Sequence, residues 1–271
     1  MIKSKTTAFI GAGFMGSALI RGLARSGLID PSRIIATDPR EGALKEIAAD
    51  LGVRATMDNA LAVSEADIVV ICVKPQILSG VLKTLGRKIS RKKLVISIAA
   101  GVKMETLQSL LPSGSRIIRA MPNMPSAVGQ GATAICAGGD AEEMDVAMAR
   151  QIFDAVGETV VVDEKQMDAV TGLSGSGPAF VFLFLEAFID AGVRVGLPRD
   201  VARVLALQTL YGSAKFAKST GEHPAALKDR VTSPGGTTIA GLAVLEEEAV
   251  RGALIRAVEA ATERSKELGG Q

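Results

Sequence analysis

A short run rich in glycine and hydroxyl side chains, residues 231–242, has the composition of an anion-binding turn. Pro234 fixes its own φ angle, while Gly235 and Gly236 have no Cβ, so a ligand can approach the backbone closely there. Apolar residues at helical spacing follow at once, which predicts a helix whose free amides and positive dipole end face the turn. A carboxylate would fit this turn. The alternative is an ordinary glycine-rich loop that ends in a helix cap.

A second glycine-rich pattern lies near the start of the chain. Residues 7–10 are apolar and predict a short strand, and a helix is predicted from the glycines to about residue 26. In this strand–turn–helix context the first glycine allows a tight turn, the second lets a pyrophosphate approach the backbone, and the third lets the helix pack on the strand. We therefore predict a dinucleotide site. The residues predicted to line it are Gly11, Ala12, Gly13, Phe14, Met15 and Gly16.

Two charged residues bear on which dinucleotide binds. Residues 33–37 predict a second strand, and Asp38 follows it, about 20 residues beyond the glycine pattern, where a ribose-reading residue is expected. Asp38 would accept hydrogen bonds from a free 2′-hydroxyl and repel a 2′-phosphate. Arg40 could instead pair with that phosphate. The two side chains thus favour different cofactors, NADH and NADPH.

Further apolar runs predict more strands of a parallel sheet, because they suit strands that are buried on both faces. They are residues 67–73, 93–99 and 115–120, and the runs 132–136 and 159–162 could complete the sheet, with a helix near 141–156 between them. Open α/β sheets bind ligands at the carboxyl ends of their strands. Candidates to line the cofactor there are Val73, Lys74, Pro75, Ala99 and Ala100. The alternative is that Pro75 simply begins a helix and the alanines belong to the core.

The periodicity changes near Asp163, where we place a domain boundary. From about residue 165 the pattern is helical, interrupted at 174–178, 196–198, 221–224 and the turn described first. The predicted fold is therefore an α/β Rossmann-type amino-terminal domain, residues 1–163, and an all-helical domain, residues 164–271. The helix at about 178–195 is apolar on most sides, and a domain of roughly a hundred residues has little interior in which to bury it. We predict that the helical domain dimerises.

Composition excludes several other classes of protein. The net charge of +2 is small and basic residues are mixed with acidic ones, so neither nucleic acid nor a membrane surface is expected as a partner. The one basic cluster, residues 87–93, is interpreted as a solvated loop, with phosphate binding as the alternative. Cys72 and Cys136 are interpreted as buried thiols, and with His223 as the only histidine, neither a metal site nor a catalytic triad is expected.

Two features bear on location. No signal peptide precedes the first predicted strand, which indicates a cytoplasmic protein. The longest apolar run, residues 178–195, contains charged residues and is interpreted as too short and too charged to span a bilayer.

Five motifs together resemble pyrroline-5-carboxylate reductases, the family that performs the last step of proline synthesis. They are FIGAGFMG at residues 9–16, VKPQ at 73–76, RAMPN at 119–123, GLSGSGPA at 172–179 and VTSPGGTT at 231–238. The resemblance spans the whole chain. The glycine-rich turn alone fits many dehydrogenases, whereas the last two motifs in this order are specific to this family.

The resemblance implies hydride transfer from NADPH, or from NADH given Asp38, to the cyclic imine 1-pyrroline-5-carboxylate, a small-molecule substrate, giving L-proline. It also implies a homodimer through the helical domain, often a pentamer of dimers, with the active site between the two domains. Asn59 would be an adenosine-side contact, and residues 74–75 and 99–100 would line the nicotinamide. The substrate would be held by Ser233, Gly235, Gly236, Thr237 and Thr238, with the backbone on its carboxylate and Thr238, the implied catalytic residue, on the ring nitrogen.

The chain departs from the family pattern at two positions, and two other functions remain open. Met124 stands where threonine is frequent, and Asp38 stands where many members have serine or asparagine. An iminium already carries its proton, so a hydroxyl is enough to hold the nitrogen. The alternative for Thr238 is a helix-capping role.

A dehydrogenase on the same two-domain plan would need a catalytic lysine, for which Lys165 is the nearest candidate. A non-enzymatic NAD(P)-sensing protein is the other alternative.

Overall fold

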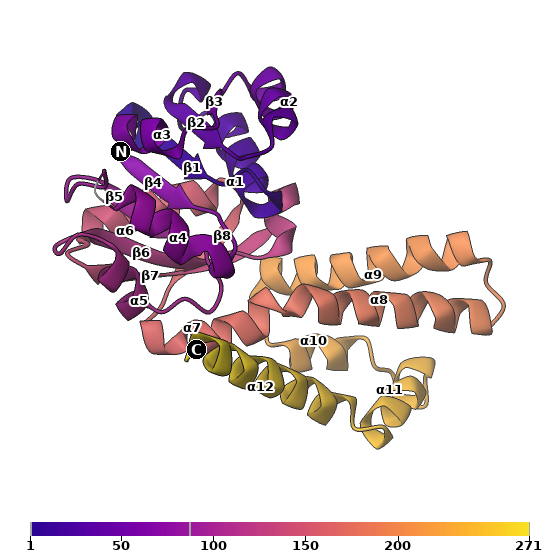
Figure 1. The fold of residues 1–271 in the computed structure, drawn as a ribbon. Helices are drawn as coiled ribbons and strands as arrows, with labels where there is room; N and C mark the ends of the chain where they lie inside the picture. Colours follow the sequence, from indigo (N-terminus) through magenta and orange to yellow (C-terminus); the bar gives the residue numbers. More distant parts are fainter. Residues whose placement is uncertain (1, 87, 271) are drawn as a thin grey trace. The chain divides into compact units, whose positions relative to one another are not determined.

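The computed structural model of the chain describes residues 2–86 and 88–270. These residues fall into two units (Figure 1). The first unit comprises the described residues up to Ser176 together with those from Ala260 onward, and the second is Gly177–Glu259. In the order of the chain, the second unit is therefore inserted between two parts of the first.

The first unit contains an eight-stranded sheet with the order β3-β2-β1-β4-β5-β6-β7-β8, as far as the described residues go. The strands are β1 Thr7–Ile10, β2 Ile34–Thr37, β3 Arg54–Thr56, β4 Ile68–Ile71, β5 Leu94–Ser97, β6 Arg116–Met121, β7 Gly131–Gly139 and β8 Gly157–Val161. Strands β1 to β6 are parallel, β7 is antiparallel to β6, and β8 is parallel to β7. Ile10 pairs with both Thr37 and Ile71, so the carboxyl ends of β1, β2 and β4 meet at one edge of the sheet.

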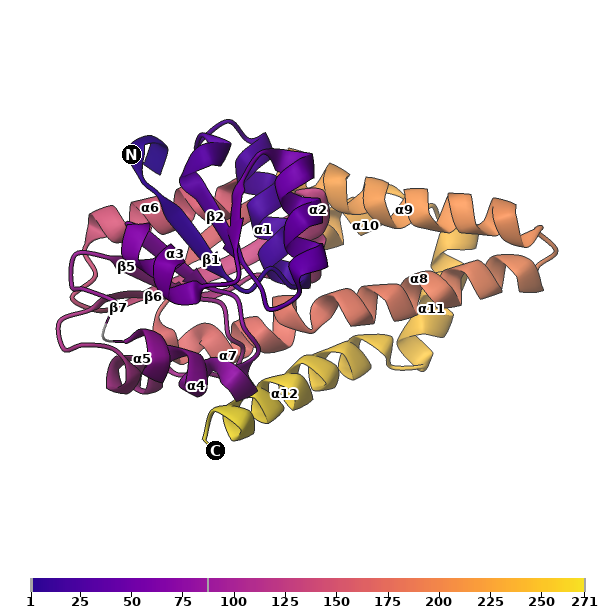
Figure 2. The same ribbon diagram turned by 45° about the horizontal axis from the view of Figure 1, so that its top comes forward.

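Helices cover both faces of this sheet, as Figure 2 shows from a second side. One face packs against α1 Phe14–Arg25, α2 Glu41–Leu51 and α6 Glu143–Asp154, and the other against α3 Asn59–Glu65, α4 Pro75–Leu85, α5 Met104–Leu110 and α7 Met167–Val170. Successive strand residues point to opposite faces: Phe9 belongs to the first core, and Ala8 and Ile10 to the second. Short 3₁₀ helices, η1 Ile2–Ser4, η2 Pro31–Arg33, η3 Met124–Val128 and η4 Glu164–Gln166, connect these elements. The predicted doubly covered sheet is thereby confirmed.

The predicted interruption at residues 174–178 is wrong. Here the chain forms a π-helix, η5 Thr171–Gly175, that continues directly into α8 Gly177–Arg194. The amide of Ser176 donates to Thr171 O at 2.9 Å, five residues back, which is the π-helical bond. A Cβ on Gly175 would lie 2.6 Å from Met121 Cε, so the glycine allows a close approach to β6 instead of breaking the helix.

The continuous helix is longer than the sequence suggested. It runs over Glu164–Arg194, 31 residues, and among the described residues it is the one helix long and apolar enough, by length and composition alone, to cross a membrane. The prediction that this segment is too short and too charged to span a bilayer is therefore wrong, because the helix begins well before residue 178. Only 6% of its apolar stretch is buried within the chain. Its apolar side chains must therefore be shielded from water by something other than this chain.

The second unit consists of helices with almost no interior of their own. They are α8, α9 Arg199–Thr220, α10 Pro224–Arg230, α11 Thr237–Glu247 and the first part of α12 Val250–Gly269. Helices α8 and α9 lie side by side as a hairpin (Figures 1 and 2): a Cβ on Gly192 would lie 2.8 Å from Ala202 Cβ, and Asp190 pairs with Arg199 at 2.8 Å. Among residues 177–259, only Ala202 and Ala206 are buried.

The units divide at Ser176, whereas the predicted domain boundary lies at Asp163. Residues 164–176 pack with the sheet: Met167 is buried in its second core, and Glu164 pairs with the buried Arg119 at 3.1 Å. The end of α12 also joins the first unit, since Ser265 Oγ donates to Asp168 Oδ1 at 2.7 Å. Domains of residues 1–163 and 164–271 stay a prediction.

Candidate functional site

The glycine-rich turn between β1 and α1 has the geometry that its spacing predicted. Gly11 has a φ of +103°, and a Cβ there would lie 3.0 Å from Cys72 O. A Cβ on Gly16 would lie 2.0 Å from Gly11 O, so α1 can meet the turn only with glycine at this position. At Gly13, in contrast, a Cβ would meet no atom within 4 Å. The first and third glycines are thus required by the fold, and the second leaves open space beside the backbone.

The amides at the start of α1 face that space. Gly13 is the N-cap of α1, with no side-chain cap, and its carbonyl accepts the first helical bond from Ser17 N at 2.8 Å. The amides of Phe14, Met15 and Gly16 precede that bond, so α-helix geometry leaves them without a partner inside the helix. Free amides at a helix start favour an anion, and contact of a pyrophosphate with this turn stays a prediction.

Asp38 and Arg40 are paired with each other. Asp38 Oδ1 accepts from Arg40 N at 3.0 Å and Nε at 2.8 Å, and Oδ2 accepts from Arg40 Nη2 at 3.1 Å. Oδ2 also accepts from Ala12 N at 3.1 Å, which ties the glycine-rich turn to the end of β2. The side-chain hydrogen bonds from Arg40 hold the pKa of Asp38 below its ordinary value. The carboxylate is therefore ionised at neutral pH.

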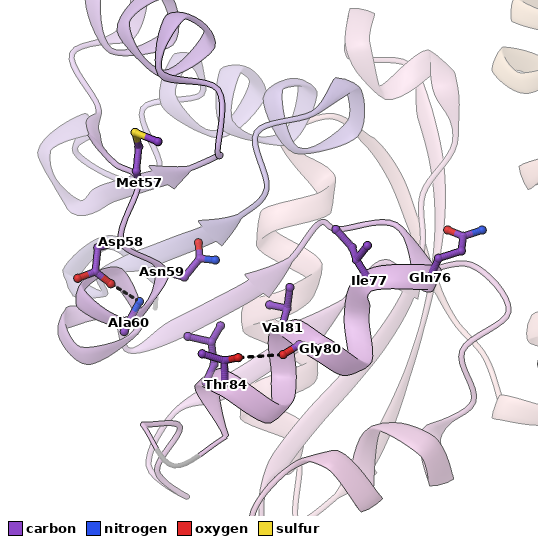
Figure 3. Close-up of a pocket in the computed structure, with 10 residues that line it drawn as sticks. Met57, Asp58, Asn59, Ala60, Gln76, Ile77, Gly80, Val81 and Thr84 are labelled. Carbon is purple, nitrogen blue, oxygen red and sulfur yellow. Dashed lines mark hydrogen bonds between the residues drawn. The ribbon is translucent and has the colours of Figure 1, made fainter.

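An open groove of about 870 Å³ lies beside this edge, between the start of α3 and α4 (Figure 3). It is lined by Met57, Asp58, Asn59, Ala60, Gln76, Ile77, Gly80, Val81, Thr84 and Leu85. Thr37 Oγ1 donates to Asn59 Oδ1 at 2.6 Å, which fixes the amide and leaves its N–H₂ donors for a ligand. Asn59, the predicted adenosine-side contact, thus stands in a groove large enough for a nucleoside.

The residues predicted for the nicotinamide side follow β4 and β5. Lys74 is the N-cap of α4 with Pro75 at its first position, so the alternative that Pro75 begins a helix is confirmed. Ala99 is 5% exposed and belongs to the second core, as the alternative also held, whereas Ala100 is exposed. Val73 is half-buried. Contact of these residues with a cofactor stays a prediction.

The turn at residues 233–238 begins α11 with glycine instead of a capping side chain. Gly235 has a φ of +64°, and Gly236 is the N-cap, whose amide donates to Ser233 O at 3.1 Å. Thr238 is the second residue of the helix and half-buried, so the capping alternative for its hydroxyl is wrong. Among the described residues, the hydroxyls of Ser233, Thr237 and Thr238 have no hydrogen-bond partner. Free amides and free hydroxyls stand together at this helix start.

Comparison with known proteins gives the family. Residues 164–268 match the family model described as pyrroline-5-carboxylate reductase dimerisation, and residues 6–101 match one described as NADP oxidoreductase coenzyme F420-dependent. The pyrroline-5-carboxylate reductase of Methanosarcina acetivorans is 50% identical over 268 residues, 99% of each chain. The Arabidopsis thaliana protein of the same name is 45% identical over 98% of this chain and 96% of its own. The chain belongs to the pyrroline-5-carboxylate reductase family.

Solved structures agree with this assignment. A pyrroline-5-carboxylate reductase from Coxiella burnetii has a TM-score of 0.94 at 39% identity and covers 98% of this chain and 99% of its own. The pyrroline carboxylate reductase of Plasmodium falciparum, solved with NADP bound, has a TM-score of 0.89 at 35% identity and covers 98% and 99%. The resemblance inferred from five motifs is confirmed, as is the fold class of an NAD(P)-binding α/β domain with a helical dimerisation domain. The family model that matches residues 164–268 describes a dimerisation domain, so a second chain would cover the exposed apolar helices of the second unit.

One residue that sequence reasoning noted only within a motif has a structural role in this reductase family member. Asn123 is 9% exposed; its Oδ1 accepts from Ala132 N at 2.8 Å, and its Nδ2 donates to Ser174 O at 3.0 Å. It therefore ties the proline-rich segment before η3 to the π-helix. A polar residue directly between Pro122 and Met124 in an apolar context is the one signal that could have found it.

Other candidates from the sequence have structural explanations. Lys165 is exposed and pairs with Asp163 at 3.5 Å, and His223 Nδ1 accepts from Ala225 N as the cap of α10. Lys93, in the basic cluster, donates to Ser64 O and Ala66 O; residue 87 of that cluster lies outside the described residues.

Both thiols are free, Cys136 buried and Cys72 half-buried. Burial raises the pKa of both thiols, that of Cys136 to about 11. Among the described residues, no three His, Cys, Asp or Glu side chains stand close enough to hold a metal ion.

Proposed function

We propose that the chain reduces 1-pyrroline-5-carboxylate to L-proline, the last step of proline biosynthesis. The observation that carries this proposal is the turn at residues 233–238, where free amides and unpartnered hydroxyls begin α11. The cofactor phosphates already have a matching turn at residues 11–16, so the second turn is left for the substrate. The names of the relatives support this assignment.

We infer that the hydride donor is NADPH, with NADH as the alternative. A bound nicotinamide dinucleotide would supply the hydride for the imine carbon. Its pyrophosphate would lie on the amides of Phe14 to Gly16, its adenosine in the groove beside Asn59, and its nicotinamide near Lys74 and Ala100. The NADP in the Plasmodium falciparum relative supports the dinucleotide class.

The substrate carboxylate would lie on the free amides at the start of α11. Gly235 and Gly236 allow the close approach, and the positive end of the helix dipole favours the negative charge. The Thr238 hydroxyl would hold the ring nitrogen and stabilise the amine as it forms. Because an iminium already carries its proton, no strong acid is required, which agrees with the exposed, ion-paired state of Lys165.

We also propose an assembly and a location. The match to a dimerisation family supports a homodimer through the helical domain, and a pentamer of dimers is the larger assembly that the family resemblance suggests. Light scattering that gives the mass of ten chains would support the larger assembly, and the mass of two chains would contradict it.

A cytoplasmic location is supported by the two free thiols, since reducing compartments keep thiols unpaired.

The reaction is tested by following oxidation of NADPH or NADH spectrophotometrically with 1-pyrroline-5-carboxylate, with L-proline measured as product. Thr238→Ala should lower kcat/KM by about tenfold to a thousandfold, the range for removal of one placed donor. Thr238→Ser should recover most of the rate, and Thr106→Ala, an exposed threonine on α5, should leave it unchanged. Unchanged kinetics in a folded Thr238→Ala protein would remove the role of this hydroxyl, and absence of proline with both cofactors would contradict the reaction.

A further inference from the structure

The segment between β5 and α5, residues 98–103, is held only weakly from within. It carries Ala99 and Ala100, which are predicted to lie on the nicotinamide side. Among the described residues, the one hydrogen bond inside this β5–α5 loop runs from Val102 N to Ala99 O at 3.4 Å, which is long for such a bond. The amides of Ala100 and Gly101 have no acceptor in the described part of the chain. Contacts from other segments must therefore fix the position of the loop.

The end of α12 supplies such a contact. A Cβ on Gly269 would lie 2.9 Å from Gly101 O, and a Cβ on Gly101 would lie 3.6 Å from Leu268 Cβ. The two backbones approach this closely because residue 269 is a glycine. A Cβ on Gly269 would also lie 3.3 Å from Lys103 Cε, so this basic side chain lies along the carboxyl end of the helix, where the dipole favours a positive charge.

Two acids of the segment before the π-helix hold both members of this contact. Asp168 Oδ1 accepts from Ser265 Oγ at 2.7 Å, and Ser265 is only 4% exposed, so the last turns of α12 are fixed beside α7 (Figure 1). Glu164 Oε1 accepts from Met104 N, the first amide after the β5–α5 loop. The loop is thus held at its far end by Glu164 and in its middle by α12.

We propose that the last turns of α12 position the β5–α5 loop for the nicotinamide end of the cofactor. Ser265 and Gly269 are positioning residues that act through the loop and not on the cofactor itself. The inference rests on the proposed function in one respect, that a nicotinamide dinucleotide binds at this edge of the sheet. A displacement of the loop by about 1 Å would misplace the nicotinamide, and a misplacement of that size can slow a reaction by about a hundredfold. The adenosine and the pyrophosphate would keep their own contacts.

Calorimetric titration of the whole protein with NADPH and with 2′-phospho-ADP-ribose, the part of NADPH that lacks the nicotinamide, tests the proposal. Gly269→Ala places a methyl group against Gly101 O, and Ser265→Ala removes the bond to Asp168. Each should weaken NADPH binding by about threefold to tenfold, the range for the loss of roughly one net hydrogen bond. Binding of the fragment should change by less than about twofold, since its contacts are distant. The pair NADH and ADP-ribose serves in the same way.

Gly270→Ala is the matched control. A Cβ there would lie 3.6 Å from Lys266 O, an ordinary contact within the helix end, so binding of both probes should change by less than about twofold. In turnover with the imine, kcat should fall by about tenfold to a hundredfold in Gly269→Ala and stay unchanged in Gly270→Ala. Alanine is a better helix former than glycine, so α12 itself should stay folded, which circular dichroism checks.

Hydrogen exchange of the wild-type protein tests the loop directly. NADPH should slow the exchange of the amides at residues 99–102, and 2′-phospho-ADP-ribose should not. Equal protection by both probes, or protection by neither, would overturn the proposal.

Other results would overturn it as well. Unchanged NADPH binding in either folded variant does so, and equal weakening of NADPH and of the fragment would show a general structural effect instead. Absence of imine reduction in a wild-type protein that shows the expected binding would contradict the proposed function and leave this inference in place. Binding of neither probe would remove both.

Discussion

The two units of this chain meet the requirement for a hydrophobic core in opposite ways. In the first unit every residue of β1, β2, β4 and β5 is buried, between two layers of helices. In the second unit only Ala202 and Ala206 are buried, and large apolar side chains such as Phe182, Leu183 and Leu205 are more than half exposed. The first unit therefore forms its core within one chain, whereas the second needs a partner chain to cover its helices.

The largest expected effect is on assembly. Leu183, 65% exposed on α8, should be covered by the partner chain, so Leu183→Arg would bury an unpaired charge there. We expect the protein to elute as a monomer or to aggregate at roughly 10 µM, since such a charge costs several kcal/mol. Light scattering after size exclusion measures this. Met144→Arg, on α6 of the first unit and 53% exposed, is the control; a dimer in both variants would mean that Leu183 is not covered.

The next effect is on the core that the first unit builds alone. Phe153 on α6 is fully buried, and Phe153→Ala should lower the free energy of unfolding by about 3–5 kcal/mol because it leaves a cavity. Urea denaturation followed by circular dichroism measures the loss. Met144→Ala on the same helix should change stability by less than about 0.5 kcal/mol. Equal small losses in both variants would contradict a self-sufficient core.

The smallest expected effect concerns the reactivity of the two thiols, which should not change when the dimer is disrupted. Cys72 and Cys136 both lie in the first unit, and with a pKa of about 11 the thiol of Cys136 is on the order of one part in a thousand ionised at pH 8. Their reaction with a disulfide reagent at pH 8 should be equally slow in the wild type and in Leu183→Arg, and fast in denaturant. Fast labelling of a dissociated but folded Leu183→Arg protein would show that the first unit depends on the dimer.

Sequence reasoning predicted the fold best where local signals decide it. The apolar run of β1 and the span of α9 agree with the structure residue for residue, the latter because Pro198 precedes it and Gly221, at a φ of +66°, ends it. The short strand β3 was missed because its three residues are not buried and carry no apolar pattern. The π-helix was mistaken for a break because the residues that lie against it, Asn123 and Met121, are distant in sequence and no local pattern reveals them.

In the candidate site, too, features set by neighbouring residues were predicted and features set by distant contacts were not. The spacing of Gly11, Gly13 and Gly16 predicted the turn, because backbone sterics depend on neighbours in sequence. The pairing of Asp38 with Arg40 could not be predicted, since it depends on rotamers and on the amide of Ala12. The orientation of Asn59, at the start of α3, likewise depends on Thr37, the last residue of β2.

The insertion of the helical unit between two parts of the first has an entropic consequence. Ser176 and Ala260 belong to the same unit, and the end of α12 is fastened there by the Ser265 to Asp168 hydrogen bond. When the helices between them unfold, that segment is still a closed loop, so it gains less conformational freedom than a free tail would. For a loop of roughly 80 residues the difference is on the order of 4 kcal/mol. A single backbone cut between α9 and α10 would remove this restraint while leaving the side-chain contacts of each helix in place.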